Sequence, residues 1–563
     1  MQTSVVPDQH DKKLRSVLPF VVFFLALVFT WYTSSVYAVT IMDSDSSSEL
    51  VLANLLAHQN AVLTTDWFYS NELRVIQTNL VFAPLFKVFS NWHTVRLVGM
   101  IVLQMILLLS FYYLCRQAQL NRRTFLYSAS ILILPFSVQY GRIVLYHSYY
   151  IVFITLGFLI VGLYLSVVRQ WSQPERTKKR VITALILFVT SFLSGLNGIR
   201  QMMITMLPLL IAAVLMTLKT ERIEEGADGK PVWYRWRWLI TGVIVCGFCY
   251  FGYLVNVKVL SEIYTYRSYE ATTTVFITGE NLIKMLQDFF SQFGYQPNRR
   301  VFSMGGLLAC ASLFAASYVI LWSCRRLLSP KIEKIGSGRQ TSAGAFIEIF
   351  APVSILTTLV VFCFIKVDAH YFLYFIPAVV WIVPFLACRL ETSRTENTAS
   401  RALLLLTCAV FLGNGVFNNA YFINPGQQDV IYEGLGRKDI HTVQELQGAV
   451  NFLQKNQYTL GYATYWCSNV VTEMTNGEIP MVNVQVNTKN PAIAYYNWLT
   501  DKRYRDSSFV KDKKVFLLLP INENDAFLST PMADTASEVY QDDLYVIYDF
   551  EYSDDPWNAL NEA

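Results

Sequence analysis

Charged residues are scarce in this chain. Asp, Glu, Lys and Arg make up 15% of its 563 residues, whereas 53% are hydrophobic. A soluble globular protein carries about a quarter charged residues, so the composition excludes that class and indicates a membrane protein. The net charge is only +4, and we expect no nucleic-acid partner.

Cysteine outside the hydrophobic runs and glycosylation acceptors are also lacking. Cys467 is the one cysteine of the C-terminal region, which excludes a disulfide scaffold there because a single cysteine cannot form an internal bridge. The sequence contains no Asn-x-Ser/Thr acceptor. This absence favours a bacterial plasma membrane over the secretory pathway of a eukaryote.

Hydrophobic runs dominate what is present. About eleven are long enough, or nearly so, to cross the hydrocarbon core of a bilayer. They cover residues 17–42, 94–115, 124–140, 148–168, 181–195, 202–218, 238–258, 301–323, 343–365, 370–388 and 402–420. We therefore predict a polytopic α-helical membrane protein, with the shorter runs of 181–218 tilted or half-buried.

The distribution of Lys and Arg predicts the orientation. Most basic residues fall in alternate connections, namely 12–15, 116–123, 169–180, 219–237, 325–339 and 389–401. Basic connections remain on the cytoplasmic side. The N-terminus is therefore expected in the cytoplasm and the C-terminal region outside. We expect the first run to remain as a span rather than be cleaved as a signal peptide, because its apolar stretch continues past Val36-Tyr37-Ala38.

Two domains are predicted. Residues 1–420 form the transmembrane module, with outer loops 43–93 and 259–300, and residues 421–563 form a small extracytoplasmic α/β domain. In the second loop, the apolar residues of 282–293 share one helical face, as in an interfacial helix. For the outer domain we predict a helix at 442–457, a strand at 460–466, a helix beginning at Asn490-Pro491 and a strand at 514–519.

Two carboxylates stand where the first hydrophobic run ends. Asp43 and Asp45 are costly to desolvate and do nothing to span a membrane. Ser46-Ser-Ser-Glu49 matches a capping box, so we expect a helix to begin just after Asp45. An ionised carboxylate there could act as a general base or hold a divalent metal. The alternative is that Asp45 only caps the helix and Asp43 only marks the membrane boundary.

This region carries a resemblance to a known superfamily. A span that ends in an acidic motif (Met42-Asp-Ser-Asp45), then an amphipathic helix, then the Pro-containing segment 79–86, resembles the GT-C superfamily of multi-span glycosyltransferases. These enzymes use sugars carried on a polyprenyl phosphate, as protein mannosyltransferases and aminoarabinose transferases do. The resemblance implies that Asp43 or Asp45 is the catalytic base, and that the sugar is transferred with inversion.

A transfer of this kind also needs cations for the leaving phosphate. Basic residues are rare at the outer ends of the spans, and we select Arg142, His147, Arg200, Lys366 and His370 as candidates for binding the donor phosphate, with Arg267 in the second loop. Each has the alternative of snorkelling to lipid headgroups. Residues 370–377 are similar to the Arg-Tyr-x-x-Pro-like start of a late span in the superfamily, with His370 in place of Arg.

Two further acidic residues of the first outer loop, Asp66 and Glu72, are weaker candidates for orienting an acceptor or a metal. The alternative is that both are solvated surface charges. The Asp-x-Asp spacing suits a divalent cation, Mg or Mn, but several branches of the superfamily work without one. No cofactor is therefore required by the sequence.

The leading hypothesis is a membrane glycosyltransferase that moves a sugar from a polyprenyl-phosphate donor to a hydroxyl of a glycan, lipid or protein acceptor at the outer face. A transporter or flippase is the first alternative. It would need ionisable residues deep in the spans or broken helices at matching positions of two repeats. A non-catalytic membrane anchor for an outer binding domain is the second.

Overall fold

The computed structural model describes most of the chain. The described residues are 9–40, 42–171, 177–224, 236–266, 280–296, 299–329, 342–364, 375–393, 398–423, 443–487, 492–505, 509 and 513–550. They form two compact units. The first comprises Met1–Ser34, Leu103–Leu254 and Ala271–Leu435, and the second comprises Ser35–Val102, Val255–Glu270 and Gly436–Ala563.

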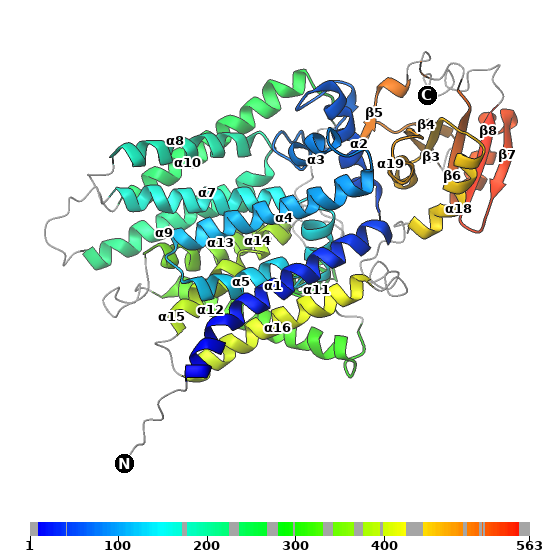
Figure 1. The fold of residues 1–563 in the computed structure, drawn as a ribbon. Helices are drawn as coiled ribbons and strands as arrows, with labels where there is room; N and C mark the ends of the chain where they lie inside the picture. Colours follow the sequence, from blue (N-terminus) through cyan, green and yellow to red (C-terminus); the bar gives the residue numbers. More distant parts are fainter. Residues whose placement is uncertain are drawn as a thin grey trace. The chain divides into compact units, whose positions relative to one another are not determined.

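Long apolar helices build the first unit. Its helices, including three that extend into the second unit, are α1 (Gln9–Thr40), α4 (Trp92–Gln117), α5 (Arg122–Ile133), α6 (Val138–Tyr140), α7 (Ile151–Gln170), α8 (Thr177–Gly195), α9 (Leu207–Glu224), α10 (Arg237–Lys258), α11 (Glu280–Ser291), α12 (Met304–Leu328), α13 (Ser342–Phe364), α14 (Ile376–Val379), α15 (Ile382–Thr392) and α16 (Thr398–Ile423). Figure 1 shows α7 beside α8 and α9 beside α13. This arrangement confirms the predicted polytopic helical class.

Each predicted hydrophobic run corresponds to a helix in the described residues, but fewer of them qualify as spans. Eight helices are long and apolar enough to cross a membrane, or nine with the bent pair Arg122–Ile133 and Val138–Tyr146. Helix α8 is 19 residues long, yet its first turn contains three basic residues. The run at 370–388 lies partly outside the described residues and otherwise forms the short helices α14 and α15.

The bent pair has the form of a broken span or a re-entrant loop, not of one straight helix. Its two halves meet at 85°, and Pro135 lies at the break, where a proline cannot continue a helical hydrogen-bond pattern. The Asn418 side chain donates to the Pro135 carbonyl at 2.7 Å, and Ser137 caps the second half through the Tyr140 N–H. These contacts satisfy backbone groups that a break would otherwise expose to hydrocarbon.

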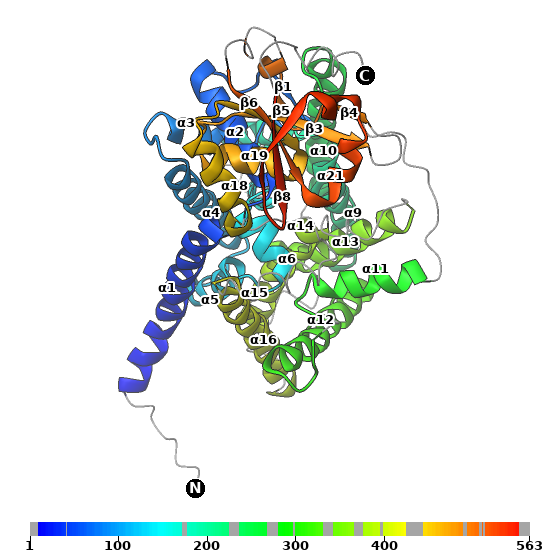
Figure 2. The same cartoon turned by 90° about the vertical axis from the view of Figure 1, so that its right-hand side faces the viewer.

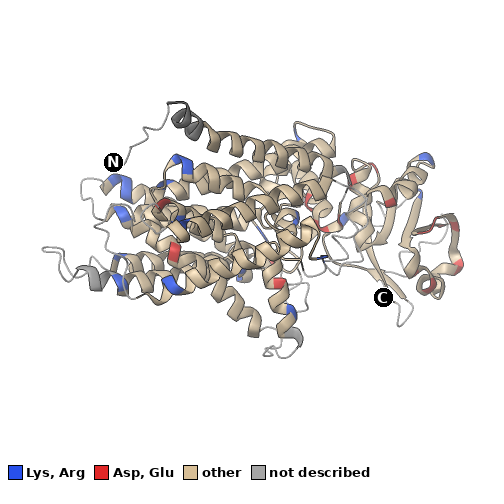
Figure 3. Cartoon of the chain, turned by 90° about the horizontal axis from the view of Figure 1, so that it is seen from below, with Lys and Arg blue, Asp and Glu red and all other residues tan. Residues whose placement is uncertain are grey.

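Basic residues of the first unit are concentrated at one end of its helices, and its buried Glu348 is ion-paired. Figure 3 shows Lys and Arg gathered at one end of its helices. Glu348 is fully buried and accepts an ion pair from Arg326 at 2.8 Å, with Arg389 at 3.8 Å. The pairs connect the end of α12, the start of α13 and the end of α15. Glu348 therefore holds these three helix ends together.

The helix predicted in the second outer loop is confirmed as α11. Phe289 and Phe293 are buried, whereas Ile283 is 61% exposed. Its apolar face is therefore divided between packing contacts and surface.

The second unit combines segments that are far apart in the sequence. Besides the adjoining ends of α1, α4 and α10, it contains α2 (Ser44–Gln59), β1 (Trp67–Phe68), α3 (Asn79–Phe86), α18 (Val443–Lys455), β2 (Leu460–Thr464), α19 (Tyr465–Met474), β3 (Met481–Asn487), β4 (Ala492–Tyr495), β5 (Thr500–Asp501), β6 (Val515–Pro520), α21 (Ile521–Leu528), β7 (Ala536–Gln541) and β8 (Tyr545–Phe550). The predicted α/β character of the C-terminal part is confirmed.

A six-stranded mixed sheet forms the core of that part, in the order β4-β3-β2-β6-β8-β7. Strand β2 is parallel to β3 and β6, and β4, β7 and β8 are antiparallel to their neighbours. Figure 2 shows α18 and α19 on one face of the sheet and α21 on the other. Leu446 and Val470 pack on the first face and Phe527 on the second, as expected for a sheet buried on both sides.

The prediction of a helix beginning at Asn490-Pro491 is wrong. Residues 488–491 lie outside the described residues, and Ala492–Tyr495 form β4, which pairs antiparallel with residues 484–487 of β3. The local Asn-Pro signal is overridden by pairing at the sheet edge, where a strand needs only one partner.

Short strands join the first outer loop to the C-terminal part. Strand β1 pairs antiparallel with β5, Trp67 opposite Asp501 and Phe68 opposite Thr500. The Lys502 N–H donates to the Asp66 carbonyl at 2.8 Å, and the Tyr69 N–H donates to the Thr265 carbonyl at 3.0 Å. Backbone hydrogen bonds therefore fix the loop that carries the acidic residues.

Candidate functional site at the start of helix α2

Helix α2 begins two residues earlier than predicted, and its cap is Asp43 instead of Asp45. The Asp43 Oδ1 accepts the Ser46 backbone N–H at 2.8 Å, and the Ser46 hydroxyl oxygen accepts the Asp43 backbone N–H at 3.3 Å. This is a complete capping box. Asp43 is only 1% exposed. The expectation that Asp45 caps the helix is therefore wrong, since Asp43 already satisfies the orphan N–H groups.

Asp45 stands in the first turn and has a different environment. Its side chain is partly exposed, and its Oδ1 accepts a hydrogen bond from the Tyr465 hydroxyl. Tyr465 is the first residue of α19 in the C-terminal part. Negative charge is favoured in the first turn of a helix, and the bond from Tyr465 orients the Asp45 carboxyl as an acceptor.

Tyr465 is held as a neutral donor. Burial raises the pKa of Tyr465 well above its ordinary value, and the neighbouring carboxylates of Asp45 and Asp43 raise it further. The phenol therefore keeps its proton at any physiological pH. A neutral hydroxyl can donate to a carboxylate without neutralising its charge.

A buried ion pair fixes the position of this turn. Arg96, near the start of α4, binds both carboxylate oxygens of Glu473 on α19 and also donates to the Ser46 carbonyl at 3.1 Å. The Arg96 and Glu473 side chains are 5% and 1% exposed. Bidentate Arg–carboxylate pairs are geometrically specific, so α2, α4 and α19 are held in one arrangement around the acidic turn.

Glu49 lies one helical turn after Asp45 and does not close a capping box with Ser46. Its Oε2 accepts the Thr78 hydroxyl at 2.5 Å, which connects α2 to the cap of α3. Burial raises the pKa of Glu49 above its ordinary value, and the Asp45 carboxylate raises it further, against the lowering effect of Thr78, Arg74 and Arg96. Residues i and i+4 face the same side of a helix, so Asp45 and Glu49 form an acidic face.

The raised pKa predicts a pH-dependent stability. Because the pKa of Glu49 is higher in the folded state than in the unfolded chain, protonation of this carboxyl stabilises the folded state. The stabilisation is fully present below the ordinary pKa of 4.5. It is lost as the pH rises through the pKa of the folded state. Glu49→Gln stays neutral and keeps an acceptor for Thr78. We expect its thermal unfolding midpoint to exceed that of the wild type by roughly 2–4 °C at pH 8, about 1 kcal/mol for a unit of this size.

The midpoints should converge at pH 4, where the wild-type carboxyl is protonated. A pH-independent difference between Glu49→Gln and wild type would contradict the assignment of the raised pKa.

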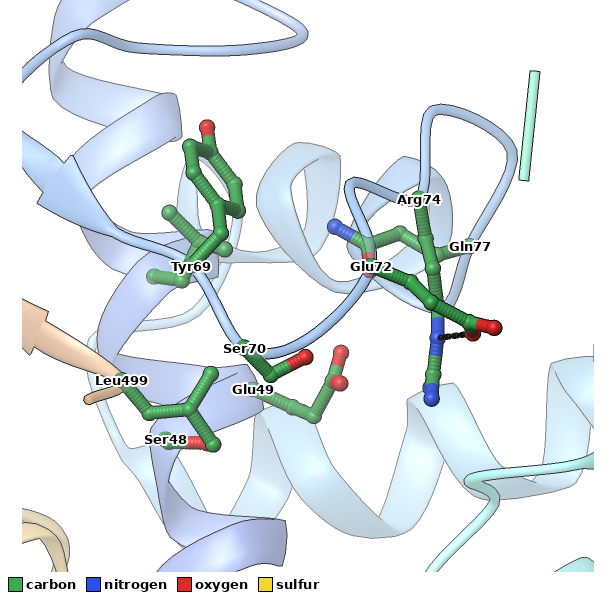
Figure 4. Close-up of a pocket in the computed structure, with 9 residues that line it drawn as sticks. Ser48, Glu49, Tyr69, Ser70, Glu72, Arg74, Gln77 and Leu499 are labelled. Carbon is green, nitrogen blue, oxygen red and sulfur yellow. Dashed lines mark ion pairs between the residues drawn. The ribbon is translucent and has the colours of Figure 1, made fainter. Parts of the chain in front are cut away.

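A small polar pocket lies beside this acidic face. It is lined by three residues of α2, five of the segment that follows β1, and Leu499: Ser48, Glu49, Leu52, Tyr69, Ser70, Glu72, Arg74, Gln77 and Leu499. Figure 4 shows Glu49 and Ser70 pointing into the pocket, with the Arg74–Glu72 ion pair opposite. The Arg74 Nε lies 3.8 Å from the Glu72 Oε2. The predicted candidate Glu72 is thus a buried pocket residue, not a solvated surface charge.

Asp66 has a local role in the loop. Its Oδ2 accepts the Gln59 side chain at 2.7 Å, at the end of α2, and its backbone N–H donates to the Thr64 hydroxyl. The polar pocket is lined by other residues. The structure therefore gives Asp66 a structural contact and does not group it with Glu72.

The predicted phosphate-binding residues that the structure describes all belong to the first unit. Arg142 lies in the π-helical turn Gly141–Tyr146, in the second half of the bent pair, and His147 follows that turn. Both side chains are buried. This burial speaks against the alternative that they snorkel to lipid headgroups. π-Helical turns occur often at functional sites.

Arg200 is the third described candidate. Its guanidinium donates to the Tyr150 hydroxyl and lies 5.0 Å from the centre of that ring. The Tyr150 backbone N–H reaches the Ile143 carbonyl at 3.4 Å, so Tyr150 connects Arg200 with the turn that carries Arg142. Arg267, Lys366 and His370 lie outside the described residues.

Sequence reasoning missed four residues of this site, Tyr465, Arg96, Glu473 and Glu49 in its actual role. The one signal for Arg96 in the sequence was its position near the start of a predicted span, where a charged side chain usually has a partner. Within the described residues, no group of three or more His, Cys, Asp or Glu side chains could hold a metal ion.

No family model and no curated protein matches this sequence. Solved structures do. ArnT from Cupriavidus metallidurans, bound to undecaprenyl phosphate, is similar with a TM-score of 0.51 and 10% identity over 95% of this chain and 99% of that chain. An oligosaccharyltransferase from Archaeoglobus fulgidus, in complex with Zn and sulfate, has a TM-score of 0.47 and 13% identity over 89% of this chain and 68% of that one. The likeness to ArnT confirms the predicted fold class, a polytopic helical membrane protein with a C-terminal α/β part.

Proposed function

We propose that this chain is an integral-membrane glycosyltransferase that moves a sugar from a polyprenyl-phosphate donor to a hydroxyl acceptor. The observation that carries the proposal is the acidic turn directly after the first span, where Asp43 caps the helix and leaves Asp45 oriented by Tyr465. The GT-C-like fold supports the same class. The ArnT structure holds undecaprenyl phosphate, which supports a polyprenyl-phosphate donor here.

In the proposed reaction, the Asp45 carboxylate accepts the proton of the acceptor hydroxyl. The acceptor oxygen forms a bond to the anomeric carbon as the bond from that carbon to the phosphate oxygen breaks. Polyprenyl phosphate leaves with the electron pair, and the anomeric configuration inverts. A general base of this kind contributes about 100- to 10,000-fold to the rate.

Cations are proposed to balance the charge on the leaving phosphate. Arg142 and Arg200 supply guanidinium groups that bind phosphate oxygens in pairs, and His147 adds a third donor. Lys366 and His370 remain candidates for the same role from the sequence. The polar pocket of Glu49 and Glu72 suits a hydroxyl-rich acceptor, because carboxylates accept hydrogen bonds from sugar hydroxyls.

The proposed location is the outer face of a bacterial plasma membrane, with the N-terminus in the cytoplasm. The gathering of basic residues at one end of the helices (Figure 3) supports this orientation. The domain division proposed is a transmembrane module of residues 1–420 and an extracytoplasmic domain of residues 421–563. Cell-envelope glycans, lipids and proteins are the proposed acceptors.

The proposal is tested in cells by comparing envelope glycans of strains that produce the wild type, Asp45→Asn or no protein. We expect the Asp45→Asn strain to show the glycan pattern of the strain without the protein, at wild-type protein levels. Unchanged glycans in the Asp45→Asn strain would contradict the assignment of the base.

Tyr465→Phe separates orientation from chemistry. Removing the hydroxyl leaves the ionised form of Asp45 with one donor fewer than before. We expect kcat to fall by about tenfold, the effect of one hydrogen bond to a charged group. The acid limb of the pH–rate profile should move to higher pH. A lower kcat with an unmoved acid limb would show that Tyr465 acts only through packing.

The broken span is the one feature that a transporter would share, since discontinuous helices line transport sites. A transporter would need a second break at the matching position of a repeat, and the described residues contain one bent pair. Uptake of a lipid-linked sugar into sealed vesicles by the purified protein, without transfer, would favour that alternative.

A further inference from the structure

A groove separates the C-terminal half of α2 from α3. Leu56, Ala61 and Val62 form one wall, Leu80, Ala83 and Pro84 form the other, and Asn60 and Lys87 stand at its end. The cavity volume is about 230 Å³. This is below the usual size of a pocket for a whole small molecule. Its apolar walls suit a hydrocarbon segment.

One buried side chain in this groove is unsatisfied. Asn79 is 2% exposed and lines the cavity, and neither its amide nitrogen nor its amide oxygen has a hydrogen-bond partner among the described residues. A buried amide without partners costs free energy. Its presence in an apolar groove indicates an occupant that is mostly hydrocarbon but carries a hydrogen-bonding group.

The mouth of the groove is cationic. The Lys87 ammonium donates to the Asn60 side chain at 2.5 Å, and an ammonium has three N–H groups, so the same group can also bind an anion. Neighbouring apolar side chains are exposed, with Val62 at 53%, Leu80 at 42% and Val88 at 71%. Apolar surface next to a cation is the pattern of a membrane-surface element.

The chain also holds this groove close to the bilayer. Helix α3 ends at Phe86, and α4, a candidate span, begins at Trp92. Residues 87–91 between them can cover at most roughly 17 Å when fully extended. Figure 1 shows α2 and α3 side by side near the start of α4. Lipids are therefore the molecules at highest local concentration beside the groove.

We propose that the α2–α3 groove binds an anionic phospholipid. One acyl chain fills the apolar cavity, the Asn79 amide donates to an ester carbonyl, and the Lys87 ammonium binds the headgroup phosphate. A bound lipid would tie the outer loop to the membrane surface at the base of the acidic helix. The proposal stands apart from the proposed function, because lipid binding is measured without any sugar transfer.

The test uses the full-length protein, purified in detergent and stripped of lipid, with phosphatidylglycerol as the probe and phosphatidylcholine as the zwitterionic comparison. Native mass spectrometry counts bound lipid. Ala83→Trp fills the groove, Lys87→Gln removes the cation, and Lys455→Gln removes an exposed lysine of α18 as the matched control. We expect phosphatidylglycerol affinity to fall at least tenfold in Ala83→Trp, several-fold in Lys87→Gln, and not at all in Lys455→Gln.

Asn79→Leu provides a second test of the groove if Ala83→Trp does not fold. Removing the unsatisfied amide should raise the unfolding midpoint of the lipid-free protein and reduce the stabilisation that phosphatidylglycerol adds. Three results would overturn the proposal. In the first, all groove variants bind phosphatidylglycerol as tightly as the wild type does; in the second, the wild type binds phosphatidylcholine and phosphatidylglycerol equally. In the third, undecaprenyl phosphate displaces phosphatidylglycerol, which would assign the groove to the sugar donor.

Discussion

Replacing Asp45 by Asn is expected to reduce kcat by about 1,000-fold with little change in KM. Asn keeps the shape of the side chain and its hydrogen bond from Tyr465, but it cannot accept a proton from the acceptor. Loss of a general base costs about 100- to 10,000-fold. The effect should appear in kcat and kcat/KM alike, because the lost interaction belongs to the transition state. Steady-state release of polyprenyl phosphate measures it.

Asp43→Asn provides the decisive comparison. Asn caps a helix as well as Asp does, so this variant keeps the hydrogen bond to the Ser46 N–H and loses only a charge. We expect it to retain activity within about tenfold. Asp525→Asn, at an exposed position of α21, is the neutral control. A loss in Asp43→Asn as large as in Asp45→Asn would transfer the role of base to Asp43.

Glu473→Gln is expected to destabilise the second unit by about 3–5 kcal/mol. The change leaves the Arg96 guanidinium buried without its counter-charge, and breaking one side of a buried pair costs about that much. The thermal unfolding midpoint should fall by roughly 10 °C. Because Arg96 also holds the Ser46 carbonyl, activity should be lost at temperatures that the wild type tolerates.

Glu478→Gln makes the same substitution at an exposed position five residues later, and it should leave the midpoint unchanged. The double variant Arg96→Met, Glu473→Met removes both charges and should recover part of the lost stability, as replacement of a buried pair by apolar side chains often does. A midpoint for Glu473→Gln equal to that of Glu478→Gln would show that the pair contributes nothing to stability.

Local patterns predicted much of this molecule. Hydrophobic length located the helices, because about 20 apolar residues in a row suit little besides a span. The acidic motif located the candidate site, since carboxylates at a membrane surface need a reason to be there. Capping chemistry predicted that a helix begins beside the motif, but it chose Asp45 as the cap where the structure has Asp43. Several Ser and Asp residues in succession make the exact first turn ambiguous to a local rule.

Long-range contacts could not be predicted in this way. Tyr465 meets Asp45 across 420 positions of sequence, and Glu473 meets Arg96 across 377. No periodicity of 3.6 or 2 residues records such a pairing. The edge strand β4 shows the same limit, because its Asn-Pro signal is local and its pairing with β3 is not. The functional grouping therefore depends on the folded second unit.

The most direct test is the release of polyprenyl phosphate by the purified full-length protein. Undecaprenyl-phosphate-linked sugars are supplied one at a time with a cell-envelope extract as acceptor, and free undecaprenyl phosphate and glycosylated product are quantified together. With the wild type, we expect at least one donor to yield free undecaprenyl phosphate and glycosylated product in equal amounts. With Asp45→Asn we expect neither of these two products. Equal release of undecaprenyl phosphate by the wild type and Asp45→Asn, or product formed from a nucleotide sugar with no lipid-linked donor, would contradict the proposed reaction.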